Sequence, residues 1–526
     1  MKTFENPVLK GFHPDPSICR VGEDYYLITS SFCYFPGLPV FHSRDLVHWE
    51  QIGHAIHRKE QLDYQNCAHS GGLWAPTIRY HEGTFYIINT FVSEDSEETQ
   101  GSVCRNFIVT TEDIRGDWSK AVFIEGADGI DPSLYFGEDG RVWYMSNRVP
   151  ARELWTGHKE IYIAEMNPVT FQFTGEKTVI WDGAKTFSNY IEAPHLYKRK
   201  DWYYLLVAEG GTFTNHSVMI ARSRQITGPY EICPRNPIVT NRHRKLNSQI
   251  AATGHADLVE TQNHEWWMVL LAVRPYEDFL YNLGRETFLV PIAWEQDEWP
   301  IIDNEYGLVL STERMPDLAV SVKPGVSPND HFENEKLSLI WNTLRHSGAE
   351  FYTLKERPGS LHIYAQTYEL TENRTSSFVG RRQQHKDFFA AAAMEAFLPA
   401  GNEEAGLAVL QNHKYQFQYL LSKSGNHMFL KLYEVKNGQI SVLTEKEIAP
   451  ASRIYLGIQG AEDRYSFYYG YREGEKKLLY ADADGSILSS TVAGGFVGTY
   501  IGMYVTSHGY ETQAYADFDW FEYYSL

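Results

Sequence analysis

Four ionisable residues occupy matching places in a repeated segment of the sequence, and their side chains could do acid–base chemistry. Asp15, Asp131 and His255 each begin one copy of this segment, and Glu192 directly precedes another. Each alone has an ordinary explanation, because an Asp before Pro often begins a turn and an isolated His is usually a structural group. Three acids in one pocket would repel one another, however, and this is costly unless a function requires it.

Carboxyl groups gathered in this way could hydrolyse a glycosidic bond. That reaction needs a carboxylic acid that protonates the leaving oxygen, and a carboxylate that activates water or attacks the sugar carbon. Three carboxyl groups would supply both roles, together with a third group that adjusts the pKa of the acid.

The regular spacing of the segment indicates a repeated structural unit. Its copies recur at nearly equal intervals, at positions 15–18, 75–78, 131–134, 193–196 and 255–258. Each copy is followed, after a turn containing Gly or Asp in most cases, by a run rich in Tyr, Trp, Ile and Val, at positions 24–30, 83–89, 140–146, 201–207 and 264–270. Two such runs joined by a short turn are typical of an antiparallel β-hairpin.

Five units of this length, each with room for four strands, predict a five-bladed β-propeller and hence an all-β fold. In a propeller, the innermost strand of each blade lines the central axis. Residues at the start of the five inner strands should therefore meet in one pocket, although they lie far apart in the sequence. Residues 74–76 would contribute from the second blade.

A second domain follows the repeat. The repeat ends after residue 303, and a polar stretch with three prolines at residues 315–330 is typical of a linker. Beyond it, strand-like runs at residues 361–364, 415–419, 465–469 and 516–521 predict a β-sandwich. We therefore expect a propeller at residues 1–315 and a sandwich at residues 328–526.

Composition limits the class of partner and the compartment. The formal net charge of −20 argues against nucleic acid, because binding a polyanion requires a basic surface. No run approaches the roughly 20 apolar residues that span a membrane. The first residues lack the features of a secretory signal, so we expect a cytoplasmic protein. The five widely spaced cysteines fit buried thiols better than a disulfide framework: Cys19, Cys33, Cys67, Cys104 and Cys233.

Seven short motifs also occur in a fixed order: NPVLKGFHPDPSI at residues 6–18, GGLWAP at 71–76, GIDPS at 129–133, EAPHLY at 192–197, AEGGT at 208–212, GHADLVE at 254–260 and LGRET at 283–287. This series resembles glycoside hydrolase family 43, specifically its two-domain β-xylosidases and α-L-arabinofuranosidases. The resemblance implies a five-bladed propeller, in agreement with the repeat, followed by a concanavalin-like sandwich. It also implies an exo-acting enzyme of xylan degradation that releases xylose or arabinose from small oligosaccharides.

By this resemblance, three acids have distinct roles. Asp15 is the general base, Glu192 is the general acid, and Asp131 holds the acid in place and keeps its pKa raised by like-charge repulsion. The resemblance implies inversion in one step, for which the base and acid carboxyl groups stand ~6.5–9.5 Å apart to admit a water. Neither a covalent sugar intermediate nor a required cofactor is expected.

The resemblance also implies substrate-binding residues. Arg285 matches an arginine that contacts sugar hydroxyls, and Phe32 and Trp74 match an apolar wall for the sugar ring. His255 matches a histidine near the propeller axis, where the family sometimes holds a water-bridged divalent cation. Calcium or another divalent cation at His255 and a purely structural role for this residue both remain open. Phe496 resembles a sandwich-loop aromatic that narrows the pocket.

Three further residues are candidates for substrate contacts. Ala75 lies in the repeated segment of the second blade, and Thr212 and Phe213 follow the AEGG motif. Departures from the pattern of the best-known xylosidases at residues 74–77, 190–193 and 272–275 leave a predominantly α-L-arabinofuranosidase specificity open.

Two other functions are disfavoured by the sequence. A propeller that binds sugars without catalysis is disfavoured because the three acids are intact. A retaining five-bladed glycosidase is disfavoured because the Trp-Met-Asn-Asp-Pro opening of that type is missing. Whether the chain forms a homo-oligomer stays open.

Overall fold

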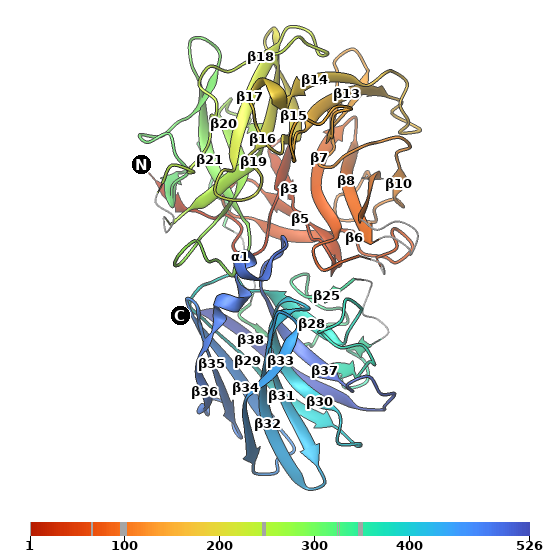
Figure 1. The fold of residues 1–526 in the computed structure, drawn as a ribbon, viewed down its shortest axis with the longest axis vertical. Helices are drawn as coiled ribbons and strands as arrows, with labels where there is room; N and C mark the ends of the chain where they lie inside the picture. The colour runs from red at the N-terminus through yellow and green to blue at the C-terminus, as the bar shows by residue number, and fades with distance from the viewer. Residues whose placement is uncertain are drawn as a thin grey trace.

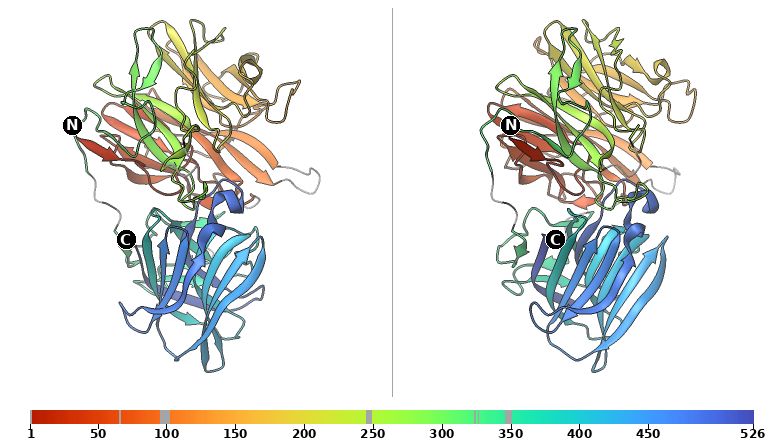
Figure 2. Two further views of the ribbon diagram at one scale, coloured as in Figure 1. Left: turned by 60° about the vertical axis from the view of Figure 1, so that its left-hand side comes forward. Right: turned by 90° about the vertical axis from the view of Figure 1, so that its left-hand side faces the viewer.

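Two β-rich bodies make up the computed structural model of the chain, which describes residues 2–64, 67–94, 102–244, 249–322, 325, 327–345 and 351–526. Figure 1 shows a propeller, coloured red to green, above a sandwich of two sheets, coloured cyan to blue, and Figure 2 shows the same two bodies from two further sides. Helical structure among the described residues is limited to α1 (Ser490–Ala493) and the 3-10 turns η1 (Gly183–Lys185) and η3 (Gly485–Leu488). No helix in this part of the chain is long and apolar enough to cross a membrane.

Five four-stranded antiparallel sheets form the blades of the propeller. In chain order, their strands are β2 (Ser17–Val21), β3 (Asp24–Ile28), β5 (Gly37–Ser43) and β6 (Glu50–Ile56) in blade 1; β7 (Gly72–His81), β8 (Thr84–Glu94), β9 (Ser102–Thr111) and β10 (Val122–Phe123) in blade 2; β11 (Ser133–Phe136), β12 (Val142–Arg148), β13 (Glu160–Met166) and β14 (Thr178–Asp182) in blade 3; β15 (Glu192–Arg199), β16 (Trp202–Glu209), β17 (Ser217–Ser223) and β18 (Glu231–Ile232) in blade 4; and β19 (Ala251–Glu260), β20 (Trp266–Val273), β21 (Glu286–Trp294) and β22 (Pro300–Ile302) in blade 5.

The first strands of the blades form a closed ring. Contacts join β2 to β7, β7 to β11, β11 to β15, β15 to β19, and β19 back to β2. Apolar faces of adjacent blades pack together; Met145 and Ile163 of blade 3, for example, share a buried cluster with Leu205 and Met219 of blade 4. The predicted five-bladed propeller is therefore confirmed, and the predicted hairpins are the first two strands of each blade.

The N-terminal segment fastens this ring. Strand β1 (Thr3–Glu5) pairs with β23 (Thr312–Arg314), which follows the last blade. The side chain of Asn6 donates to the carbonyl of Leu289 in β21 and accepts from the amide of the same residue, each at 2.9 Å. The beginning and the end of the propeller are thus hydrogen-bonded to one another.

Two eight-stranded antiparallel sheets form the sandwich. One contains β24 (Asn329–Asp330), β26 (Tyr352–Thr353), β27 (Leu361–Tyr364), β29 (Phe388–Phe397), β34 (Ile454–Ala461), β35 (Arg464–Gly470), β36 (Lys477–Asp484) and β38 (Tyr515–Ser525). The other contains β4 (Tyr34–Phe35), β25 (Asn342–Leu344), β28 (Phe378–Arg382), β30 (Glu404–Asn412), β31 (Tyr415–Ser424), β32 (His427–Lys436), β33 (Gln439–Ile448) and β37 (Tyr500–Thr506). Their inner faces share one apolar core, so the predicted sandwich is confirmed.

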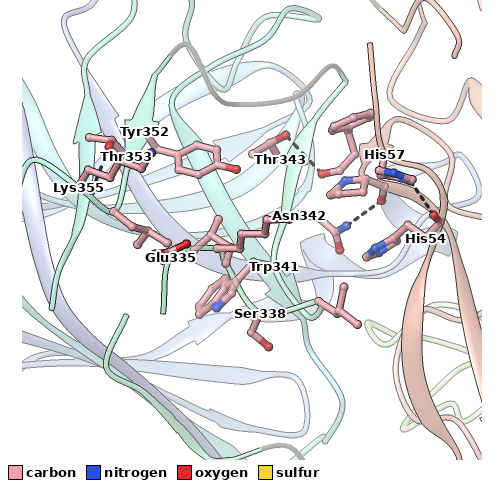
Figure 3. A pocket seen from close by; sticks show the side chains of 16 residues that line it. His54, His57, Glu335, Ser338, Trp341, Asn342, Thr343, Tyr352, Thr353 and Lys355 are labelled. Atoms are coloured by element: carbon pink, nitrogen blue, oxygen red, sulfur yellow. Dashed lines mark hydrogen bonds between the residues drawn. The ribbon is translucent and has the colours of Figure 1, made fainter. Parts of the chain in front are cut away.

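The propeller contributes one strand to the sandwich. Strand β4 follows the second strand of blade 1 in the sequence but pairs with β25 of the sandwich. Beside this pair, Asn342 Nδ2 donates to the carbonyl of Pro36 at 3.0 Å, and Thr343 Oγ1 donates to the carbonyl of Phe35 at 3.4 Å. Figure 3 shows Asn342 and Thr343, together with His54 and His57 of blade 1, among the side chains that line a cavity where blade 1 meets the sandwich. Backbone and side-chain bonds therefore hold the two domains together.

The domain boundaries at residues 315 and 328 stay predictions. Part of the predicted linker, namely Lys323, Pro324 and Val326, lies outside the described residues.

The expectation of buried thiols is wrong for one cysteine. Cys104 is exposed, whereas the other four cysteines are buried. Cys104 belongs to the first part of β9, where four successive residues are exposed before the strand enters the core.

Candidate active site

One pocket lies at the end of the propeller where the inner strands begin, and its volume is about 380 Å³. Residues of all five blades and one residue of the sandwich line it: Asp15, Phe32, Trp74, Ala75, Ile130, Asp131, Lys159, Tyr190, Glu192, Gly210, Gly211, Thr212, Phe213, His216, His255, Arg285 and Phe496. The structure therefore brings every candidate residue from the sequence to this one pocket.

The backbone is shaped alike at matching points of the blades. Asp15, Asp131 and His255 have φ values of 55°, 54° and 47°, in the left-handed region that residues other than glycine seldom adopt. In blade 4 the left-handed residue is Ala193, with φ of 50°, and Glu192 lies one place earlier. A β-bulge directly after Glu192 interrupts the pairing of β15 with β16, and bulges often re-aim side chains beside active sites.

Asp15 is buried and held from two sides. Arg285 donates an N–H to one carboxyl oxygen at 2.6 Å, and Ser30 donates its hydroxyl to the other at 2.5 Å. The ring of His255 lies 3.6 Å from the first oxygen. Burial lowers the pKa of His255, so this ring is neutral at neutral pH. These contacts fix the orientation of the Asp15 carboxyl group, as a group that accepts a proton from water requires.

Two further carboxyl groups in the pocket have raised pKa values. Burial raises the pKa of Glu192 to about 7, while the charge of Lys159 opposes this rise and the charge of Asp15 adds to it. Burial also raises the pKa of Asp131 well above its usual range, and the charges of Glu192 and Asp15 raise it further. A carboxyl group with a pKa near 7 keeps enough of its proton in neutral solution to donate it.

Aromatic rings form one wall of the pocket. The ring centroid of Phe32 is 6.2 Å from that of Trp74 and 6.3 Å from that of Phe496. Trp74 Nε1 donates a hydrogen bond to the carbonyl oxygen of Ser70 at 2.9 Å. The amide of Phe496 donates to the hydroxyl oxygen of Ser70 at 3.0 Å. Arg285 also donates to the carbonyl of Phe496, at 3.3 Å. The sandwich loop is thereby attached to the propeller and completes an apolar wall on which a sugar ring can stack.

A buried ion pair fixes the inner strands below the pocket. Asp257 of β19 accepts hydrogen bonds from Arg79 of β7 at 2.8 Å and from the hydroxyl of Ser17 of β2 at 2.7 Å. Burial favours the neutral form of Asp257, but the charges of Arg79 and His195 and the hydrogen bonds from Arg79 and Tyr197 together lower the pKa of this carboxyl group. Ser17 and Asp257 lie two residues after Asp15 and His255, so these bonds hold two pocket residues at a fixed spacing.

Some residues of the pocket were not predicted from the sequence. Lys159, Tyr190 and His216 lie on loops outside the repeated segments, where neither the period nor a motif marks them. The sequence offers one indication of a role for Tyr190, because this residue lies two positions before the candidate acid Glu192. Lys159 directly precedes β13, and nothing in the sequence around it indicates a role in the pocket.

The part of the chain that the structure describes contains no group of three His, Cys, Asp or Glu side chains able to hold a metal ion. His255 faces Asp15 and Arg285 instead of a set of metal ligands. These residues do not fit a directly coordinated cation, and the water-bridged cation stays a prediction.

Comparisons with known proteins cover both domains. The family described as "Glycosyl hydrolases family 43" matches residues 4–300, and the "Beta xylosidase C-terminal Concanavalin A-like domain" matches residues 329–524. The chain is 37% identical over 523 residues to the non-reducing end α-L-arabinofuranosidase BoGH43B of Bacteroides ovatus, with 99% of this chain and 95% of that protein covered. It is 36% identical over 528 residues to a xylosidase/arabinosidase of Butyrivibrio fibrisolvens, with 99% of each covered.

A solved structure shows the same arrangement. The chain superposes on the xylan β-1,4-xylosidase from Bacillus halodurans C-125 with a TM-score of 0.92 and 34% sequence identity, over 99% of both chains. Sequence and fold agree along the whole length, and the three acids of the pocket supply the groups that glycoside hydrolysis requires. The chain therefore belongs to glycosyl hydrolase family 43 and is a glycosidase.

Proposed function

We propose that the chain releases single terminal xylose or arabinose residues from small xylo- or arabino-oligosaccharides, with inversion at the anomeric carbon. The observation that carries this proposal is the meeting of Asp15, Asp131 and Glu192 in one pocket of about 380 Å³. The sandwich residue Phe496 lines the same pocket. A pocket, unlike an open groove, receives the end of a chain, and this favours exo action.

Each acid has a separate role in the proposed reaction. Asp15 takes a proton from a water molecule, and the oxygen of that water attacks the anomeric carbon. Glu192 gives its proton to the glycosidic oxygen as the bond to the leaving sugar breaks. Asp131 and Glu192 repel one another when both are ionised, and this repulsion raises the pKa of Asp131, so the pair of carboxyl groups tends to keep one proton. Bond formation and bond cleavage occur in one step, which inverts the configuration.

The relatives support a pentose as the released sugar. The Bacteroides ovatus protein is named an arabinofuranosidase, and the Butyrivibrio fibrisolvens protein is named a xylosidase/arabinosidase. A predominantly α-L-arabinofuranosidase activity is therefore the second candidate, favoured by the 37% identity to the first of these proteins. Phe32 and Trp74 offer an apolar wall to either sugar.

Hydrolysis of two aryl glycosides tests this function directly. We expect the purified chain to cleave 4-nitrophenyl β-D-xylopyranoside, 4-nitrophenyl α-L-arabinofuranoside or both, and to release a sugar whose first-formed anomer is opposite to that of the substrate. Proton NMR in the first minutes detects this anomer before mutarotation, and parallel values of kcat/KM give the preferred sugar. Retention of the anomeric configuration would contradict the single displacement. If the chain cleaved neither aryl glycoside, the proposed specificity would be wrong.

Removal of the Lys159 charge should move the alkaline limb of the pH profile. The ammonium group of Lys159 lowers the pKa of Glu192, which is about 7 in the parent chain. Activity is present below this pKa, where Glu192 carries its proton, and is lost as the pH rises through it. Because Lys159→Met removes a stabilising charge from the carboxylate, the limb should move to higher pH.

The profile of kcat/KM against pH for an aryl glycoside measures this shift. Lys120→Met, which changes an exposed lysine of blade 2 outside the pocket, is the matched control and should leave the limb in place. An unchanged or lower limb in Lys159→Met would show that Lys159 does not act on Glu192.

A further inference from the structure

Three loops surround the pocket on the side of blades 3 and 4. They connect β12 to β13 (residues 149–159), β14 to β15 (residues 183–191) and β16 to β17 (residues 210–216). In an antiparallel blade, alternate connections lie at the same end, so all three emerge where Glu192 begins its inner strand. Together they carry five exposed large apolar side chains: Val149, Leu154, Phe187, Tyr190 and Phe213.

Tyr190 joins the pocket to this surface. It lines the pocket, and its ring lies between two neighbouring loops. A Cβ atom added to Gly157 would lie 2.9 Å from the ring, and one added to Gly211 would lie 3.1 Å from it. The amide of Tyr190 also donates to the carbonyl of Gly157 at 2.8 Å. The rim of the pocket and these loops are therefore one packed unit.

Next to Gly157, three rings stack in a row. The ring of Trp155 lies 4.6 Å from that of His158 and 6.3 Å from that of Phe187, with interplanar angles of 24° in both pairs. His158 Nε2 forms a hydrogen bond with Asp182 at 2.7 Å, and this bond fixes the inner end of the row. Phe187 is the outer end and is 85% exposed.

The conformation of Phe187 is costly and leaves its ring in solvent. Its φ of 54° places a bulky residue in the left-handed region, where it is an outlier. Strain of this kind persists where the surroundings enforce it, and it is concentrated at ligand-binding sites. An exposed aromatic ring stacked on a fixed Trp is well suited to pack against the apolar face of a sugar.

The position of the acid shows where the rest of the substrate leaves the pocket. In an inverting reaction the acid lies beside the leaving oxygen, and the base lies on the opposite face of the sugar ring. Glu192 directly follows the loop that carries Phe187, whereas Asp15 belongs to blade 1. The chain beyond the scissile bond therefore passes over Tyr190 and onto this loop.

We infer that Trp155 and Phe187 form a platform for the leaving part of the oligosaccharide, and that the ring of Phe187 stacks on its second sugar unit. This inference rests on the proposed function. The first leaving sugar lies at Tyr190, which lines the pocket, and the second reaches the stacked rings. Chains of three or more sugars use the platform, whereas a disaccharide ends before it.

Substrates of graded length test the platform. For Phe187→Ala we expect kcat/KM to fall roughly three- to tenfold on a trisaccharide, the range for loss of one stacked ring, and to stay unchanged on the disaccharide. The probes are β-1,4-linked xylobiose and xylotriose, or α-1,5-linked arabino-oligosaccharides of the same lengths if arabinose is the preferred sugar. Tyr510→Ala is the matched control, because this side chain is 66% exposed and lies on the sandwich beyond β37.

Two outcomes would overturn the platform: equal effects of Phe187→Ala on both lengths, or no effect on either. If the parent chain cleaves neither oligosaccharide, the proposed function fails, and binding decides the platform separately. Isothermal titration of the trisaccharide into Asp15→Asn protein, with and without Phe187→Ala, should then show a roughly three- to tenfold weaker Kd for the double variant. Equal Kd values would overturn the inference.

Discussion

Asp15→Asn is expected to lower kcat on aryl glycosides by about 10³- to 10⁴-fold, the upper part of the range for loss of a general base. Asparagine keeps the size of the side chain, so Arg285 and Ser30 can still contact it. Its amide cannot take a proton from the attacking water. The loss should be equally large for 4-nitrophenyl and 2,4-dinitrophenyl glycosides, because the base acts on water and not on the leaving oxygen.

The matched control is Asp45→Asn. Asp45 is fully buried in blade 1 but lies outside the pocket, so this change tests the loss of a buried carboxyl group without the loss of the base. Thermal unfolding followed by circular dichroism reports the fold of both variants. Activity of Asp15→Asn within about tenfold of the parent chain, a loss of only about 1.4 kcal/mol of transition-state stabilisation, would remove Asp15 from the role of base.

The sequence predicts the propeller and the approximate location of the site because both depend on the repeat. A nearly constant period indicates five equal units, and the ring of β2, β7, β11, β15 and β19 places the equivalent residues of these units around one axis. Asp15 and Glu192 belong to the first and fourth units and lie far apart in the sequence, yet both line the pocket for this reason.

The repeat does not give the finer placement of the site. Glu192 lies one residue earlier in its blade than Asp131 does in blade 3, and a bulge in β15 follows it. A single-residue offset of this kind depends on hydrogen-bond pairing that no composition or period reports. The matching residue of blade 4 is Ala193, which has the left-handed backbone but no group that can react.

Contacts between the domains are also absent from the local sequence pattern. Strand β4 is very short, and its partner β25 belongs to the other domain, beyond all five blades in the sequence. Only the resemblance of its loop to that of related enzymes predicts Phe496, whose amide donates a hydrogen bond to the hydroxyl of Ser70 in the second blade. The effect of Lys159 on the pKa of Glu192 could not be predicted from the sequence either, because it arises only when two loops meet.

Glu192→Gln is expected to separate substrates by their leaving groups. Glutamine cannot donate a proton to the glycosidic oxygen, so kcat on natural oligosaccharides should fall by about 10²- to 10⁴-fold. A 2,4-dinitrophenolate ion leaves without protonation, so acid catalysis adds little to the cleavage of its glycosides. The value of kcat on these glycosides should therefore fall by less than about tenfold. The alkaline limb near pH 7 should also disappear from the pH profile, because the group whose pKa is about 7 is gone.

Glu313→Gln is a close control for this experiment. Burial also raises the pKa of Glu313 to about 7, and Asn304 donates to it at 2.9 Å, but it lies in β23 outside the pocket. If the limb near pH 7 arose from any buried glutamate, it would change in Glu313→Gln as well. If Glu192→Gln lost equal activity on both kinds of leaving group, the acid would have to be Asp131, the other carboxyl group of the pocket with a raised pKa. The dependence on the leaving group therefore assigns the proton donor between two neighbouring acids, which pKa values alone do not distinguish.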